Sequence, residues 1–263
     1  MRIIHLSDLH FGTEIPDLVK ALALHIRQRP ADLIIVSGDF TQIGSGDEFR
    51  LAHDFVHSFG IPVFCVPGNH DIPRFGLLDR LMHPYARYPK YIDADMLPVF
   101  ENQSVCIAGI NTARRVLPHW NWAHGAISRI QLVHLKKTYE NSKALVRICV
   151  MHHPVHKVKD QHFKTIVYGG DHALEELKRM KINLVLTGHV HHASVTSIEH
   201  EGHRTMFLSA STALSRRLRQ SANGYNVITI ERNTLQIEMF SYKDFDFMPL
   251  ETITHNISGA LFS

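Results

Sequence analysis

The sequence has few cysteines and no long hydrophobic run. Only three of its 263 residues are cysteine, and each lies in an apolar stretch without the spacing of a disulfide framework or a zinc site. We interpret Cys65, Cys106 and Cys149 as buried thiols in a reducing compartment. No apolar run approaches the ~18 residues of a membrane span, and no secretory signal follows residues 1–6. We therefore expect a cytoplasmic protein with no membrane partner.

Excess charge of one sign is also scarce. The chain carries 28 lysines and arginines against 25 aspartates and glutamates, a formal net charge of +3. Proteins that follow a nucleic-acid backbone need a marked basic surface, so this balance does not favour nucleic acid as a partner. Hydrophobic residues make up 44% of the chain, which at this length is enough for a sizeable core.

Hydrophobic periodicity predicts alternating strands and helices, with antiparallel strands after His192. No repeat or linker interrupts the chain, so we expect one domain, residues 1–263, with a layered α/β fold and strands in two sheets. Residues 74–98 are broken by three prolines and are expected to form loops and a short helix. The predicted strands are 2–7, 32–37, 62–66, 104–110, 145–151, 182–186, 195–199, 204–208, 225–231 and 234–242; the predicted helices are 16–28, 47–59, 128–139 and 173–180.

Five of these strands end in Asp, Asn, His and Gly residues. In α/β sheets ligands bind beyond the carboxyl ends of the strands, so the five loops are expected to converge. In extended backbone, residues two positions apart point to the same side, which would let Asp8 and His10 hold one ion together, and likewise His189 and His191. Glycines precede several of the candidates where the backbone must turn sharply or pass close to an ion. The candidate ligands are Asp8, His10, Asp39, Asn69, His152, His189 and His191.

This set of side chains predicts a metal centre. Histidine is the commonest metal ligand, and the chain contains 21 histidines. Carboxylate, amide and imidazole groups without thiolate suit Mn, Fe or Zn in a catalytic site more than a structural zinc cage. Seven ligands exceed what one catalytic ion with open positions uses, whereas two ions that share Asp39 account for them. The alternative for Asp8 and Asp39 is a role as turn or capping residues, but their convergence with three histidine blocks disfavours that interpretation.

The candidates fall in five blocks: Asp8-Leu9-His10, Gly38-Asp39, Gly68-Asn69-His70-Asp71, His152-His153-Pro154 and Gly188-His189-Val190-His191. In this order the blocks resemble the five signatures of the calcineurin-like metallophosphoesterases. Length and block spacing are closest in appearance to the bacterial class III cyclic-nucleotide phosphodiesterases. The resemblance implies a four-layer αββα fold, in which a two-sheet β-sandwich is flanked by helices.

The resemblance also implies a role for each site residue. The ligands of one ion would be Asp8, His10, Asp39 and His191, and those of the other Asp39, Asn69, His152 and His189. His70 is not a ligand in the family but sits over the substrate phosphate, where it would stabilise developing charge or protonate the leaving group. Asn69 and His70 would thus face substrate, and His153 is a further candidate for substrate contact or for packing. Asp71 either orients His70 or shapes the turn.

We therefore predict a metal-dependent phosphodiesterase that cleaves a small-molecule phosphodiester by attack of a metal-bridging hydroxide. The first substrates to test are 3′,5′-cyclic nucleotides. A DNA or RNA nuclease and a glycerophosphodiesterase are alternatives within the same superfamily, and a metal-free protein-binding scaffold is the alternative from another class. Scaffolds of this kind lose ligands, whereas this chain keeps all seven. The basic segment with Arg216, Arg217 and Arg219 is either a solvated face or a patch that faces phosphate.

Overall fold

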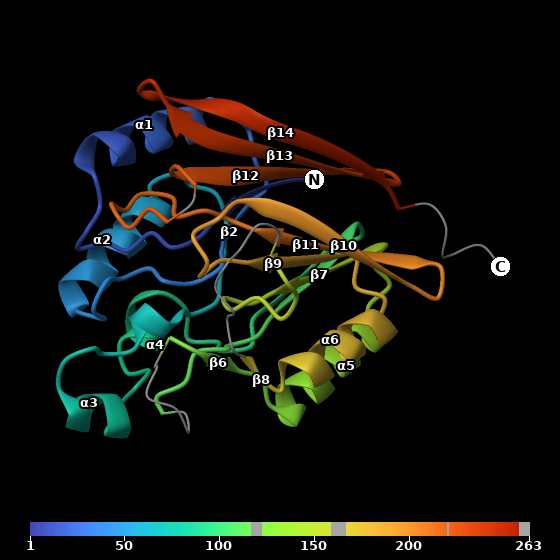
Figure 1. Ribbon diagram of the computed structural model, residues 1–263, viewed down its shortest axis with the longest axis horizontal. Helices are drawn as coiled ribbons and strands as arrows, with labels where there is room; N and C mark the ends of the chain where they lie inside the picture. Colours follow the sequence, from blue (N-terminus) through green and yellow to red (C-terminus); the bar gives the residue numbers. More distant parts are fainter. Residues whose placement is uncertain (117–122, 159–166, 220, 258–263) are drawn as a thin grey trace.

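Two six-stranded sheets form the centre of the molecule, and helices lie on their outer sides (Figure 1). The computed structural model describes residues 1–116, 123–158, 167–219 and 221–257. The first sheet has the order β14-β13-β12-β1-β2-β3 and the second the order β10-β11-β9-β7-β5-β4. The strands of the first sheet are β1 (Arg2–Leu6), β2 (Leu33–Val36), β3 (Val63–Cys65), β12 (Gly224–Glu231), β13 (Thr234–Lys243) and β14 (Asp246–Asn256). Those of the second are β4 (Val99–Glu101), β5 (Val105–Gly109), β7 (Val146–Val150), β9 (Leu184–Thr187), β10 (Ser194–His200) and β11 (His203–Ser209).

Helices cover both outer faces of the sandwich. Helices α1 (Pro16–Arg27) and α2 (Gly46–His57) pack on the first sheet, and α5 (Arg129–Asn141) and α6 (Gly170–Arg179) on the second (Figure 1). Two of them begin with a capping box, in which a serine and the residue three positions later satisfy each other's backbone N–H: Ser45 in α2 and Ser128 in α5. The shorter elements are β6 (Gly125–Ala126), β8 (Val167–Tyr168), the 3₁₀ turn η1 (Asn69–Asp71), α3 (Leu77–Met82) and α4 (Tyr88–Tyr91).

Three apolar clusters separate the four layers, and the continuous apolar strands supply side chains to two of them at once. Successive residues of a strand point to opposite faces, so Ile4 packs under α1 and α2 while Ile3 faces the second sheet. In β5, Cys106 contacts the α5 and α6 side while Ile107 packs between the sheets. This double burial explains the lack of polar alternation in these strands and confirms the four-layer αββα fold.

Parallel pairing places the carboxyl ends of the central strands at one edge of each sheet. Strand β1 pairs in parallel with β2, and β2 with β3; in the other sheet β5, β7, β9 and β11 are parallel neighbours. The later strands β12 and β13 pair in an antiparallel manner, as predicted, and β14 continues this pairing at the edge of the sheet.

The predicted elements are confirmed with shifts of a few residues, but four strands were missed. Strands β4, β6 and β8 have two or three residues each, too few to show a period. Strand β14 has no apolar alternation because it is an edge strand with mostly exposed side chains. The proline-rich 74–98 region holds two short helices, α3 and α4, where one was expected. Within the described ranges, no helix is long and apolar enough to cross a bilayer.

Candidate metal centre

Five loops meet where the two sheets come together, and each follows a central strand. Backbone hydrogen bonds join the loops after β1 and β2: Asp8 N–H donates to the Gly38 carbonyl and His10 N–H to the Asp39 carbonyl, both at 3.0 Å. The loops after β7 and β9 are joined by Gly188 N–H, which donates to the His152 carbonyl at 3.0 Å. The structure therefore brings all seven predicted ligands into one buried region.

The backbone at these residues is left-handed, which corrects the expectation of extended i and i+2 pairs. The φ angles are 52° at Asp8, 47° at His10, 56° at Asp39, 69° at His189 and 53° at His191. Residues other than glycine rarely adopt this backbone conformation. Those that do are often found at functional sites, where the surrounding structure stabilises them. The strands end at Leu6 and Thr187, so the side chains converge because the loops bend and not because they continue the strands.

Asp8, His10 and His191 form one group of potential ligand atoms. Oδ1 of Asp8 lies 3.1 Å from Nε2 of His191 and 3.6 Å from Nε2 of His10, and the two Nε2 atoms are 3.2 Å apart. His10 directs Nδ1 at the Thr41 carbonyl at 3.2 Å, and His191 directs Nδ1 at the Arg217 carbonyl at 2.5 Å. Donation from Nδ1 leaves the lone pair of each neutral ring on Nε2, facing Asp8.

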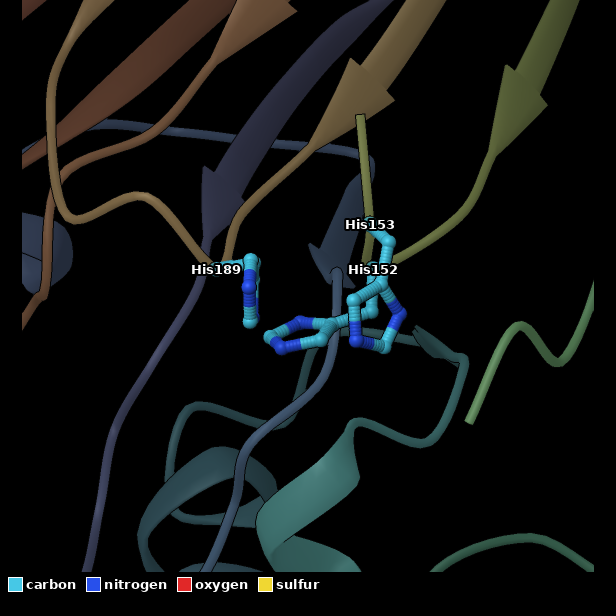
Figure 2. Close-up of side chains that lie close together, drawn as sticks. All are labelled: His152, His153 and His189. Carbon is cyan, nitrogen blue, oxygen red and sulfur yellow. The ribbon is translucent and has the colours of Figure 1, made fainter. Parts of the chain in front are cut away.

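Asp39 lies between this group and a second one. Its Oδ2 is 3.6 Å from Nε2 of His10 and 3.3 Å from Nε2 of His152. His152 directs Nδ1 at the Ser37 carbonyl at 2.7 Å, so the ring Nε2 again faces the site. Nδ1 of His189 lies 3.0 Å from Oδ1 of Asn69, which completes the second group. Figure 2 shows the rings of His152, His153 and His189 side by side below the ends of β7 and β9.

The side chains fit bound metal ions, because two of the potential ligand atoms are buried without a partner. Oδ1 of Asp8 and Nε2 of His152 are buried and have no hydrogen-bond partner. Buried polar atoms are nearly always paired in proteins, so such orphans are typical of a metal site. Several groups of three side chains here have ligand atoms within 4.8 Å of one another, among them Asp8, His10 and His191, and Asp8, Asp39 and His152.

Charge in the site favours cations. Burial alone would raise the pKa of Asp8 and of Asp39, but the surrounding histidines outweigh burial and hold both pKa values well below the usual range. In the same way, burial would lower the pKa of His152, but Asp39 and Asp8 raise it to about 9. Burial, together with His153 and His152, lowers the pKa of His189 well below the usual value, although Asp39 and Asp8 act in the opposite direction.

His70 sits beside these groups, half-buried, with its ring edge-on to His10 at 4.8 Å between centroids. Its backbone N–H donates to Oδ1 of Asp39 at 2.8 Å. Nδ1 lies 2.7 Å from the Gln42 carbonyl, and Nη1 of Arg217 lies 2.8 Å from Nε2. Because a guanidinium can only donate, Nε2 accepts and the proton is on Nδ1. Burial lowers the pKa of His70 to about 4, although Asp39 acts in the opposite direction.

His153 and Asp71 have other partners. Both ring nitrogens of His153 are occupied, Nδ1 by the Thr112 hydroxyl at 2.7 Å and Nε2 by the Ala123 carbonyl at 3.0 Å. The carboxylate of Asp71 accepts Gly68 N–H at 2.9 Å and both the N–H and the hydroxyl of Thr41 at 3.0 Å. Asp71 therefore shapes the turn, and burial followed by the nearby Asp39 raises its pKa to about 7.

Three groups around the site had no individual signal in the sequence. The carbonyls of Ser37 and Thr41 orient histidines, but any residue type supplies a carbonyl. Gln42 lies near His70 and Arg217, and a lone glutamine after a glycine-aspartate block does not stand out. The basic segment 216–219 stands out in the sequence, but its charge alone does not distinguish Arg217 from its neighbours.

Comparisons with known proteins show the family and the fold. A model of the calcineurin-like phosphoesterase family matches residues 1–193. A probable glycerophosphodiester phosphodiesterase of Arcobacter nitrofigilis is 26% identical over 212 residues, 74% of this chain and 74% of that protein. A 3′,5′-cyclic adenosine monophosphate phosphodiesterase of Haemophilus influenzae is 23% identical over 213 residues, 80% of this chain and 71% of the relative. A dimetal phosphatase structure from Danio rerio has a TM-score of 0.69 at 12% identity, covers 98% of this chain and 99% of that chain, and shows the same fold.

Proposed function

The chain belongs to the calcineurin-like phosphoesterase family and is a metal-dependent phosphoester hydrolase, and we propose that it hydrolyses a small-molecule phosphodiester. The observation that carries the proposal is the position of Asp39 between two groups of ligand atoms. The names of two relatives, a glycerophosphodiester phosphodiesterase and a cyclic adenosine monophosphate phosphodiesterase, support a diester as the substrate class.

We assign seven side chains to two metal ions. The first ion takes Asp8, His10, Asp39 and His191, and the second takes Asp39, Asn69, His152 and His189. The mixture of oxygen and nitrogen ligands supports Mn, Fe or Zn. When bound, the two ions polarise the phosphoryl group and lower the pKa of water, so that a nucleophile is present near neutral pH.

The remaining residues position the substrate. Hydrolysis adds water to phosphorus and breaks the bond to one ester oxygen, which leaves with a proton. We propose that His70 faces the phosphoryl group from the edge of the site, fixed by its Nδ1–H bond to the Gln42 carbonyl. Nε2 carries no proton while Arg217 donates to it, which argues against protonation of the leaving group by His70 in this arrangement.

We place 3′,5′-cyclic nucleotides first among the substrates and glycerophosphodiesters second. The second candidate is favoured by the Arcobacter relative, whose match is the more identical of the two. Both substrates present one negative charge on a diester phosphorus, so the metal groups alone do not select between them.

A substrate panel on protein of measured metal content tests the proposal. The panel contains 3′,5′-cyclic AMP, glycerophosphocholine, bis(p-nitrophenyl) phosphate and a single-stranded oligonucleotide. We expect two ions per chain, turnover of the small diesters and little turnover of the oligonucleotide. Asp39→Asn is the control and should reduce both metal content and turnover. A wild-type protein that holds two ions but leaves every small diester intact would overturn the proposal.

A further inference from the structure

We propose that Arg217 is a substrate-binding residue, whose guanidinium donates to the phosphoryl oxygens of the bound ester. The inference rests on the proposed function, since it deepens the description of the same site. Arg217 lies in the segment that follows β11, beyond the residues 1–193 that the family model matches. Its role is therefore argued from the contacts of this chain alone.

The backbone of Arg217 is fixed to the metal centre. Its carbonyl accepts from Nδ1 of His191 at 2.5 Å, and its N–H donates to the Ser215 hydroxyl at 3.1 Å. The preceding residue is also held, because Arg216 N–H donates to the Thr13 carbonyl at 3.1 Å. These bonds fix the backbone of Arg217 beside His191, so its side chain starts at the edge of the site.

The guanidinium reaches across the site with most of its donors unused. Nη1 donates to Nε2 of His70 at 2.8 Å and to Oε1 of Gln42 at 3.2 Å. Among the described residues, no acceptor lies within hydrogen-bond distance of Nε or Nη2. No carboxylate of the described chain lies within 4.0 Å of this half-buried cation. Arg217 thus presents three N–H groups next to the residue that we place at the phosphoryl group.

The chemistry of this arrangement fits a phosphate ester. An arginine fork matches the oxygens of a phosphoryl group and binds them more strongly than a neutral donor would. A half-buried cation without an anionic partner is costly, unless a ligand supplies the negative charge. Burial lowers the pKa of Arg217, although the carboxylates of Asp39 and Asp8 act in the opposite direction.

The alternative is that Arg217 only supports the His70 ring, and binding of inorganic phosphate distinguishes the two roles without relying on catalysis. The experiment uses manganese-loaded full-length protein and isothermal titration calorimetry with inorganic phosphate. Arg217→Ala keeps the carbonyl that holds His191, so we expect unchanged metal content and phosphate binding weaker by about tenfold or more. Arg216→Ala is the matched control, since Arg216 is an exposed neighbour in the same segment, and it should bind phosphate as the wild type does.

A double-mutant cycle gives the decisive comparison. If Arg217 binds phosphate directly, Arg217→Ala still weakens phosphate binding in a His70→Ala background. If the second substitution has no further effect there, Arg217 acts only through His70 and the proposal is wrong. Loss of metal from Arg217→Ala would also overturn the proposal, because Arg217 would then act by supporting the metal ligands.

Steady-state kinetics provide a second test of the proposal. With bis(p-nitrophenyl) phosphate we expect kcat/KM of Arg217→Ala to fall about 10²-fold, with partial recovery in Arg217→Lys and on addition of millimolar guanidinium. An Arg217→Ala enzyme with wild-type kcat/KM would overturn the inference. If the wild-type protein hydrolyses no diester, the proposed function fails, and the calorimetric comparison of Arg217→Ala with Arg216→Ala still decides whether Arg217 binds phosphate.

Discussion

Gly68 and Asp39 approach each other more closely than any side chain at position 68 would permit. A Cβ atom on Gly68 would lie 2.1 Å from Oδ1 of Asp39 and 2.4 Å from its backbone nitrogen. The φ angle of Gly68 is −106°, which any residue adopts, so space and not backbone conformation requires glycine here. The crowded carboxylate is the one that lies between the two ligand groups and accepts His70 N–H at 2.8 Å.

We therefore expect Gly68→Ala to displace Asp39 and to disrupt both ligand groups at once. A displacement of about 1 Å can cost about 10²-fold in rate, so we expect a loss of that order in diester hydrolysis, together with reduced metal content. Gly46→Ala is the matched control, because its Cβ would meet only the end of the Tyr91 side chain, with Oη nearest at 3.3 Å. Elemental analysis and steady-state rates measure both effects. A Gly68→Ala protein with full metal content and full activity would contradict the steric argument.

Metal removal should lower the thermal stability of the protein. Without ions, Oδ1 of Asp8 and Nε2 of His152 remain buried without a hydrogen bond, whereas bound ions satisfy both. At a free metal concentration a hundredfold above the dissociation constant, binding adds about 2.7 kcal/mol to the free energy of unfolding. For a chain of this size we expect Tm to rise by about 5–10 °C between chelator-treated and manganese-loaded protein. In Asp39→Asn the rise in Tm on addition of manganese should be smaller than in the wild type. An equal rise would mean that the ions bind elsewhere.

The sequence predicted the layered fold and the convergence of the polar loops, because both depend on local pattern. Apolar runs such as Leu33–Val36 have side chains buried on both faces, and the polar blocks mark the points where such strands end. In contrast, the left-handed backbone at Asp8 and His10 cannot be recognised from the residue types, since aspartate and histidine occur at many strand ends in other conformations.

Contacts between distant segments were equally hard to foresee. The position of Arg217 beside His70 depends on how the segment after β11 folds back over the loop after β3. The donor for Nδ1 of His153, Thr112, lies 41 residues away in sequence. Such pairs form only in the folded chain, so single-sequence periodicity carries no information about them.

Adjacent histidines should differ in their effect on metal content. Nε2 of His152 faces Asp39 at 3.3 Å without a hydrogen-bond partner, whereas both nitrogens of His153 are occupied by Thr112 and Ala123. We expect His152→Ala to lose one of the two ions and most of the activity, and His153→Ala to retain both ions. Elemental analysis of the two purified variants measures the difference. The assignment is wrong if His153→Ala loses an ion and His152→Ala does not.

His25 should make the stability of the protein depend on pH, far from the metal centre. Its Nδ1 lies 2.5 Å from the Tyr225 hydroxyl, and its ring is surrounded by Tyr225, Phe240 and Phe247. Burial, and then Arg29, lower its pKa to about 4, while Asp246 acts in the opposite direction. The pKa in the unfolded chain is 6.5, so the unfolded state takes up the proton first as the pH falls. The contribution of neutral His25 is therefore complete above pH 6.5 and is lost progressively between pH 6.5 and 4.

The substitution His25→Gln removes this titration and keeps an amide that can bond to Tyr225. Urea unfolding at several pH values between 6.5 and 4 gives the free energy of unfolding of each protein. We expect the wild type to lose more stability over this range than the variant, although the variant starts from a lower value because its side chain fills the aromatic pocket less well. Every other titrating group is common to both proteins, so the difference in slope isolates His25. Parallel curves would show that the ring titrates alike in the folded and unfolded states, against the burial seen here.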